Sequence, residues 1–409
     1  MTIMKPTRKL LFILCIVLVL GFIYYSAWKL HLHVWAPKTY KDPHLQPSVE
    51  TKGTAVSDKA LYPSVMTKER TDADAEVEKV LSVGRGVGPV YDKQGFLLKL
   101  DEELPPELKL KYGNLSKGAC KPGYVAAKMA AIYPKFVKLA PMFLDQNYKR
   151  LGKINNYLPP FGVKTQDSII DVILTATKKY GLDKYLESLK CKRCIVVGNG
   201  GVLANKSLGS HIDGYDVVVR LNQAPVSGYE KDVGSKTTLR ITYPEGAFQK
   251  PKHYENHSLF VLSAFKPQDF KWLRQMVFKE KLHVTEGFWK SVANYVPREP
   301  ADMRILNPYF IQEAAFQFIG LPQNNGLMGK GNIPTLGTVA ITMALHNCDE
   351  VAVAGFGYDL NNPNAPLHYY EPVKMSIMKE SWTHNISKEK EFLRKLVKAK
   401  VIMDLTNGI

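Results

Sequence analysis

Short runs of β-branched and other apolar residues alternate with longer, helically spaced segments from about residue 126 to the end of the chain. The short runs predict buried strands, because each ends in turn or polar residues; they lie at 195–197, 215–221, 237–242, 259–264, 304–308 and 351–354. Apolar residues spaced three and four apart predict helices at 126–143, 166–189, 270–281, 309–319, 336–346 and 389–400, with Ser387 as the expected cap of the last. Strands alternating with helices predict an α/β domain with a mostly parallel sheet.

The amino-terminal pattern is different. Residues 10–28 carry no charge and contain Ser26 as the one strongly polar side chain, a length that just spans a bilayer core of ~30 Å. Three basic residues precede this segment and favour a cytosolic amino terminus. A cleaved signal peptide is the alternative, disfavoured because the run is long and lacks a clean small-residue cleavage site. We therefore expect a tail at 1–9, a signal anchor at 10–28, a flexible stem at 29–89 and a lumenal domain at 90–409.

The chain has a net charge of +17, which admits nucleic acid, anionic membranes or acidic small molecules as partners. No nucleic-acid-binding motif appears, and the basic residues are dispersed, so no nucleic-acid partner is expected. Four sequons after the anchor agree with a lumenal body: Asn114, Asn205, Asn256 and Asn385. Asp72 and Asp74 form an Asp-x-Asp pair of the metal-binding kind, but they lie in the stem and are interpreted as solvated charges.

Four of the five cysteines lie beyond the anchor segment, namely Cys120, Cys191, Cys194 and Cys348. The C-x-x-C spacing at 191–194 admits a zinc site or a redox pair. A zinc site would need two more suitably spaced ligands, and this C-x-x-C opens a strand rather than a helix. In a lumenal chain, two structural disulfides are the favoured interpretation.

A Gly-Asn-Gly-Gly turn at 198–201 follows the first predicted strand and would let the backbone approach a ligand closely. The next strand ends in Arg220, Leu221 and Asn222. These features predict a nucleotide site at the carboxyl edge of the sheet. A nicotinamide-dependent oxidoreductase is disfavoured, because Leu203 replaces the third glycine of the dinucleotide fingerprint and no acidic residue ends the second strand.

Four longer pieces occur in an order that is more specific than the turn alone. They are residues 191–246, residues 333–358, the His-Tyr-Tyr-Glu run at 368–371, and His384 followed by Glu389. In this order they resemble the large, small, third and very small sialylmotifs of animal sialyltransferases. The resemblance extends from about residue 91 to the end of the chain. It implies a Rossmann-like, variant GT-A type sialyltransferase fold, and a disulfide between Cys194 and Cys348 that leaves Cys120 and Cys191 as the second pair.

The resemblance also implies an activity, the inverting transfer of sialic acid from CMP-sialic acid to the 3-hydroxyl of terminal galactose in Galβ1-3/4GlcNAc. It assigns the general base to His384 and the phosphate contact to His368, with Glu389, Tyr369 and Glu371 as supporting residues. No metal is expected, because the departing CMP is a monophosphate and no diphosphate needs chelation. A Golgi membrane protein of single-pass type II topology is implied, with its catalytic domain in the lumen.

The expected donor-binding residues lie at two strand ends and one helix start: Asn199, Gly200, Gly201, Asn222, Thr335, Leu336 and Gly337. Side-chain amides can bond ribose hydroxyls or the cytosine edge, and free helix N–H groups can bind phosphate. Each feature also has a structural interpretation as an Asx turn or a helix cap. Some family members carry Asn and Tyr where this chain has Val202 and Ile333.

A second hypothesis is a membrane-tethered carbohydrate-binding protein that uses the same fold without catalysis. The presence of both His384 and His368 argues against it.

Overall fold

The computed structural model describes residues 90–91, 97–99 and 120–409, except 138–139, 256, 283–285, 324–328, 330, 360 and 379–382. The expected anchor, the whole of the stem, Asn114 and Asn256 lie outside the described residues, and so do Asp72 and Asp74 of the stem. Among the helices that are described, none is both long and apolar enough to cross a membrane.

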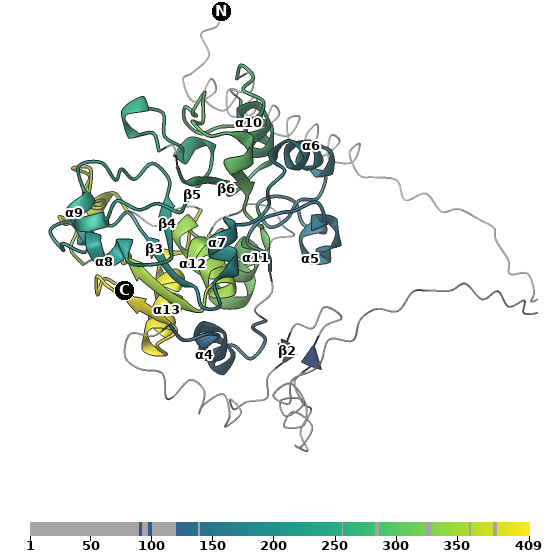
Figure 1. The fold of residues 1–409 in the computed structure, drawn as a ribbon. Coiled ribbons are helices and arrows are strands. Elements are labelled where there is room, and N and C mark those ends of the chain that lie inside the picture. The colour runs from purple at the N-terminus through teal and green to yellow at the C-terminus, as the bar shows by residue number, and fades with distance from the viewer. Residues whose placement is uncertain are drawn as a thin grey trace, which may run out of the picture. The chain divides into compact units, whose positions relative to one another are not determined.

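A seven-stranded parallel sheet forms the centre of the domain (Figure 1). Its spatial order is β7-β6-β5-β4-β3-β8-β9. The strands are β3 (Arg193–Val197), β4 (Val217–Leu221), β5 (Leu239–Thr242), β6 (Leu259–Leu262), β7 (Met303–Ile305), β8 (Glu350–Ala354) and β9 (Ile402–Asp404). A separate antiparallel pair consists of β1 (Val90–Tyr91) and β2 (Leu97–Lys99). The predicted parallel α/β sheet is confirmed.

The strand order reverses between β3 and β8. From β3 the chain adds β4 to β7 on one side, and only afterwards β8 and β9 on the other. In open α/β sheets, ligands bind outside the carboxyl ends of the strands at such a reversal. The fold therefore predicts a ligand site at the residues that follow Val197 and Ala354.

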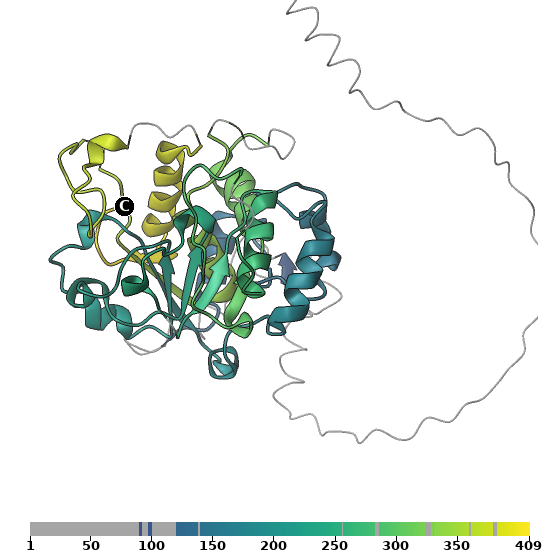
Figure 2. The same ribbon diagram turned by 90° about the horizontal axis from the view of Figure 1, so that it is seen from above.

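Helices cover both faces of the sheet (Figure 2). One face carries α4 (Tyr124–Ile132), α11 (Tyr309–Glu313), α12 (Leu336–Asn347) and α13 (Ile386–Lys398). The other carries α8 (Gly209–Asp213) and α9 (Glu230–Val233) over β3, β4 and β8, and α6 (Asp167–Thr177) and α10 (Pro267–Val277) over β6 and β7. Two short helices, α5 (Gly152–Asn155) and α7 (Lys184–Ser188), complete the set.

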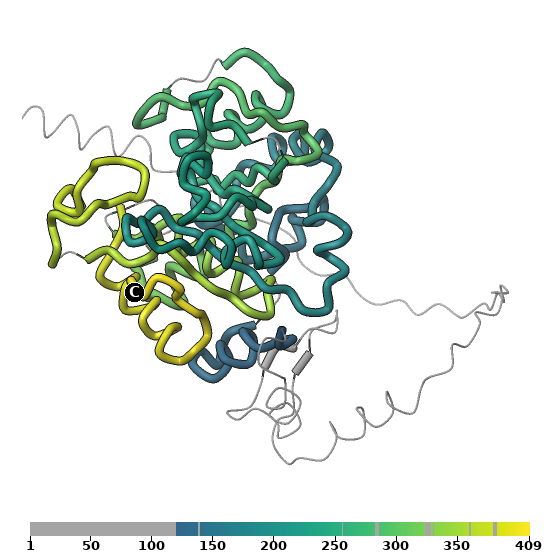
Figure 3. Tube along the Cα trace, turned by 60° about the vertical axis from the view of Figure 1, so that its left-hand side comes forward, coloured from purple at the N-terminus to yellow at the C-terminus, as the bar shows by residue number. Residues whose placement is uncertain are grey.

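The first and last of these helices lie side by side (Figure 3). The Tyr124 hydroxyl of α4 donates to the carbonyl of Lys400 at 3.0 Å, just after α13. The Lys395 ammonium of α13 lies 3.9 Å from the ring centroid of Tyr133. These contacts join α4 to α13 on the side of the sheet whose apolar core also contains α12.

Three sequence-based predictions of helices are wrong in detail. The helix predicted at 126–143 ends at Ile132, because Pro134 follows within two residues. The helix predicted at 166–189 is two helices, α6 and α7, separated at Lys178, whose backbone is left-handed with φ 59°. The cap of α13 is Asn385, whose side chain accepts from the Lys388 N–H at 3.1 Å, rather than Ser387.

Both disulfides are present with the expected pairing, Cys120–Cys191 and Cys194–Cys348. Cys194 lies in β3, and Cys348 ends α12. The second bridge therefore fixes the carboxyl end of α12 to the central strand. Because α12 returns antiparallel to the strands, its amino end lies at their carboxyl edge.

Candidate functional site

The turn after β3 is paired with the segment that contains His368. The Gly201 N–H donates to the carbonyl of Leu367, and the Tyr369 N–H donates to the carbonyl of Asn199, both at 3.1 Å. A side chain at position 201 could not fit, because its Cβ would lie 2.3 Å from the Pro366 carbonyl oxygen. The glycine turn thus brings His368 next to the end of β3.

His368 is held in a fixed orientation. Its Nδ1 contacts the Glu371 carboxylate, and its ring stacks on Tyr370 with centroids 5.3 Å apart and planes 6° from parallel. In the protonated ring, Nδ1–H donates to Glu371 and Nε2–H is a second donor, of the kind that a phosphate oxygen accepts. The Tyr369 hydroxyl donates to the carbonyl of Pro225 at 2.6 Å, which ties the segment to the loop after β4.

The amino end of α12 lies between the ends of β4 and β8. Thr335 is its cap, with the side-chain oxygen accepting from the Thr338 N–H at 3.4 Å. A Cβ at Gly337 would lie 2.7 Å from the Phe356 ring and 3.7 Å from Leu221. The first-turn N–H groups of a helix attract anions, so this end is a suitable place for a phosphate.

Glu389 of α13 is buried against this helix end. Its carboxylate accepts from the Thr335 N–H (2.9 Å), the Thr335 hydroxyl (2.6 Å) and the Thr338 hydroxyl (2.5 Å). Burial raises the pKa of Glu389, while the threonine hydrogen bonds and nearby His384 oppose that shift. Glu389 therefore holds the start of α12 in place through its contacts with Thr335 and Thr338.

His384 precedes α13 and lies beside the same helix start. Its Nδ1 is 2.8 Å from the Ile333 carbonyl oxygen, and the Ile333 N–H donates to the Thr383 carbonyl at 3.3 Å. A carbonyl oxygen only accepts, so Nδ1 carries a proton and Nε2 holds the lone pair of the neutral ring. This tautomer is the one that a general base acting through Nε2 requires.

The two asparagines lie at the ends of β3 and β4. The Asn199 side-chain oxygen is buried and has no hydrogen-bond partner within the described part of the chain. The Asn222 backbone is left-handed, with φ 51°, and its side-chain oxygen accepts from the Thr242 hydroxyl at 3.3 Å. A buried unpaired acceptor is costly unless a ligand or water satisfies it, which supports Asn199 as a ligand-binding group.

The sequence and the fold were compared with known proteins. The family model described as glycosyltransferase family 29 (sialyltransferase) matches residues 143–401. The chain belongs to this family.

Several relatives match almost the full length of the chain. The CMP-N-acetylneuraminate-beta-1,4-galactoside alpha-2,3-sialyltransferases of Mus musculus and Homo sapiens are 60% and 61% identical over 402 residues, covering 98% of this chain and 98% of each relative. The Type 2 lactosamine alpha-2,3-sialyltransferase of Rattus norvegicus is 45% identical over 254 residues, covering 62% of this chain and 76% of its own. A solved structure, "Crystal Structure of a Mammalian Sialyltransferase", has a TM-score of 0.53 and 25% identity, covering 71% of this chain and 98% of the other. The resemblance to sialyltransferases is confirmed, and the chain is a glycosyltransferase.

The sialyltransferase site thus gathers most of the predicted residues into two connected groups. The turn at 199–201 pairs with the segment 368–371, while the residues at the start of α12 contact the other group, Ile333 meeting His384 and Thr335 meeting Glu389. Phe356, which follows β8, packs against Gly337, and Gly355 packs against Gly200. Of the described sequons, Asn205 is exposed and Asn385 caps α13. Among the described residues, no group of three or more His, Cys, Asp or Glu side chains could hold a metal ion.

Sequence reasoning missed several residues that hold the site together. Thr338 was not considered as a partner of Glu389, nor Phe356 as the contact of Gly337. It also missed Arg240 and Glu255, which form a buried ion pair beside Asn222. The sequence feature that could have identified Arg240 is its position in the middle of an apolar strand. A buried charge is stable there only if it is paired.

Gly246 gives a direct test of how Asn222 is placed. In Gly246→Ala, the new Cβ would lie 2.4 Å from the Asn222 side-chain oxygen and 2.9 Å from the Thr242 hydroxyl. We expect the KM for the nucleotide-sugar donor to rise about tenfold, because overpacking of this kind costs ~1–3 kcal/mol. Gly152→Ala is the matched control, since nothing lies within 4 Å of its added Cβ. Equal donor KM values for the two variants would contradict the placement.

A buried acidic pair at the carboxyl edge of β5 and β6 gives a pH-dependent prediction. The Lys266 ammonium lies 2.9 Å from Glu245 and 2.8 Å from Asp269, and burial raises the pKa of Asp269 to about 6. The folded protein therefore gains stability from this group at low pH and loses it as pH rises through about 6. Relative to Asp269→Asn, we expect the wild type to lose about 2 kcal/mol of unfolding free energy between pH 4 and pH 7. Denaturant titrations of both proteins at each pH would measure this, and a constant difference would contradict the shift.

Proposed function

We propose that this sialyltransferase transfers sialic acid from CMP-sialic acid to the 3-hydroxyl of terminal galactose in Galβ1-3/4GlcNAc, with inversion at the anomeric carbon. The names of its full-length relatives support the donor, the linkage and a β-galactoside acceptor. The observation that carries the mechanism is the Nδ1 contact of His384 with the Ile333 carbonyl, which leaves Nε2 as the basic nitrogen.

In the proposed reaction, the Nε2 of His384 takes the proton of the galactose 3-hydroxyl. The galactose oxygen attacks the anomeric carbon of sialic acid, the bond to the CMP phosphate oxygen breaks, and CMP departs with the electron pair. Attack opposite the leaving group inverts the anomeric carbon. The negative charge of the buried Glu389 carboxylate attracts the imidazolium that forms on His384 and so stabilises it. The same attraction opposes the rise that burial causes in the pKa of Glu389.

The departing phosphate is proposed to lie between the amino end of α12 and His368. Helix N–H groups and an imidazole N–H both donate to phosphate oxygens. Asn199, with its unpaired buried oxygen, and Asn222 are proposed to bind the ribose and the cytosine edge. A monophosphate leaving group needs no bridging cation, so we propose that the transfer does not depend on a metal.

We also propose that the chain is a single-pass type II membrane protein of the Golgi, with residues 90–409 in the lumen. The uncharged segment 10–28, the preceding basic residues and the sequons support this topology. The two disulfides agree with an oxidising compartment.

A transfer assay tests the proposed function. The full chain in detergent is incubated with CMP-sialic acid and N-acetyllactosamine in EDTA, and the linkage of the product is determined. We expect an α-2,3-linked product of the β-configured donor, that is, inversion without added metal. Another linkage would overturn the acceptor position, and activity that appears only on adding manganese would overturn the metal-free mechanism.

A further inference from the structure

Three arginine side chains are buried on the face of the sheet that carries α8, α9, α6 and α10. Arg220, Arg240 and Arg298 are 2%, 3% and 7% exposed. Arg220 and Arg240 occupy β4 and β5, between the apolar cluster under α8 and α9 and the cluster under α6 and α10. Their shared acidic neighbour is Glu255. Burying a charge carries a desolvation penalty. The contacts of each arginine therefore indicate which part of the structure it stabilises.

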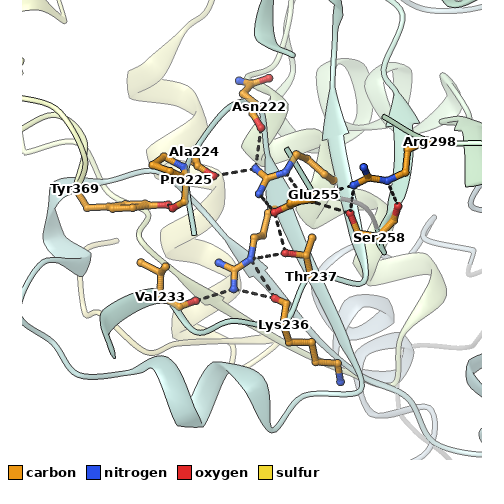
Figure 4. Close-up of polar contacts among 12 residues, drawn as sticks. Asn222, Ala224, Pro225, Val233, Lys236, Thr237, Glu255, Ser258, Arg298 and Tyr369 are labelled. Carbon is orange, nitrogen blue, oxygen red and sulfur yellow. Dashed lines mark hydrogen bonds and ion pairs between the residues drawn. The ribbon is translucent and has the colours of Figure 1, made fainter. Parts of the chain in front are cut away.

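Arg240 holds two different elements at once, and Figure 4 labels its partners Glu255, Asn222 and Ala224. Its Nε donates to the Glu255 carboxylate at 2.9 Å, and its Nη2 contacts the other oxygen of the same carboxylate. Its Nη1 donates to the carbonyl oxygens of Asn222 (2.8 Å) and Ala224 (3.0 Å). Burial alone would raise the pKa of Glu255, but the hydrogen bonds and charge of Arg240 hold it below its usual value. The arginine is therefore a fixed, charged fork between Glu255 and the turn that follows β4.

The turn it holds contains Asn222, which is proposed to bind the donor. Asn222 has a left-handed backbone, a conformation that glycine and, less readily, asparagine and aspartate adopt. Two carbonyl oxygens that point at one nitrogen fix the direction of the chain from residue 222 to residue 224. That direction, together with the contacts to Thr242 and Gly246, determines where the Asn222 amide points.

Arg298 provides a contrast within the same cluster. It also lies near Glu255, at 3.8 Å, but its hydrogen bonds go to the carbonyl and hydroxyl of Ser258 and to the Pro297 carbonyl. Figure 4 shows Arg298 and Ser258 on the side of Glu255 away from Ala224 and Tyr369. Arg298 thus shares the burial and the acidic partner of Arg240 without contacting the turn.

We propose that Arg240 is a positioning residue for the nucleotide, which holds Asn222 in its binding conformation through the backbone carbonyls of residues 222 and 224. The inference rests on the proposed function, because it takes Asn222 as a CMP contact. A guanidinium is required, since its planar fork can bond a carboxylate through one edge and the turn through the third nitrogen. A lysine offers a single ammonium that cannot reach both with the same geometry.

The test is a double-mutant cycle on CMP affinity, measured by calorimetry on the full chain in detergent. Arg240→Gln is expected to weaken CMP binding about tenfold, and Arg298→Gln less than about twofold, although both remove a buried arginine. In an Asn222→Ala background, Arg240→Gln should cause no further loss. Arg240→Lys, which keeps the charge, should raise the donor KM about fivefold while changing kcat less than twofold. If Arg240→Gln does not fold, Arg240→Lys still tests the proposal.

Several results would overturn the inference. One is an equal loss of CMP affinity in the Arg240 and Arg298 variants, which would mean a general effect on the fold. Another is a full additional loss in the Asn222→Ala background, which would mean that Arg240 does not act through Asn222. If Asn222→Ala binds CMP as tightly as the wild type, the nucleotide role of Asn222 fails and the inference with it. If the wild type binds no CMP at all, the proposed function itself fails.

Discussion

His384→Ala is expected to lower kcat by about 10²- to 10⁴-fold, the usual contribution of a positioned general base. The Ile333 carbonyl fixes the Nδ1 proton, so removal of the ring removes the basic Nε2 that accepts the proton in the proposed reaction. CMP affinity should change less than about threefold, because the proposed nucleotide contacts come from other residues. Steady-state kinetics and CMP calorimetry on the same preparation would measure both quantities.

His211→Ala is the control for this variant. His211 is an exposed histidine of α8 that contacts the ring of Tyr215. Its loss should leave kcat and CMP affinity unchanged. If His384→Ala loses CMP binding together with its folded structure, His384 is a structural residue and the assignment of the base is wrong.

The paired substitution Cys194→Ala with Cys348→Ala is expected to remove most of the stability of the domain. The bridge closes a segment of 154 residues between β3 and the end of α12. In the chain-entropy model, a loop of this length contributes about 5 kcal/mol, comparable with the lower end of the total stability of a globular domain. Thermal unfolding of the purified chain would show a large fall in midpoint temperature.

The other bridge provides the comparison for the disulfide prediction. Cys120–Cys191 closes 71 residues, and its removal is expected to cost about 4 kcal/mol by the same reasoning. Only the Cys194–Cys348 bridge anchors the helix whose other end meets His384 and Glu389. Loss of CMP affinity at a temperature where both variants are folded should therefore be confined to the Cys194–Cys348 variant. An unchanged unfolding temperature in that variant would contradict the role of the bridge.

Most of the sheet could be predicted because each buried strand is marked by its own short stretch of sequence. Buried parallel strands appear as short apolar runs, and six of the seven strands of the sheet were found in this way. The run at 402–404 was missed, since it is three residues long and one of them, Met403, is 61% exposed. The helix cap at Asn385 was missed because Asn and Ser stand two residues apart and both are good caps, so local pattern does not choose between them.

The order of the motifs predicted the main residues of the site but not the contacts between them. The order of motifs pointed to His384, but not to the carbonyl of Ile333 that selects its tautomer, because the two residues are 51 positions apart. Glu389 was expected either to orient His384 or to support nearby backbone, and the sequence does not reveal its contacts with the Thr335 N–H and the Thr338 hydroxyl. The sequence marks Arg240 as a charge within an apolar strand but does not identify its partner, since the acid, Glu255, comes from a different loop.

A structure of the protein with CMP bound would test the central claim most directly. We expect the phosphate to lie between the first turn of α12 and His368, with the nucleoside against Asn199 and Asn222 at the ends of β3 and β4. The cavity of about 420 Å³ whose lining includes Ser227, Thr237, His253 and His257 should remain without nucleotide. CMP bound in that cavity, or at the amino edge of the sheet, would contradict the account.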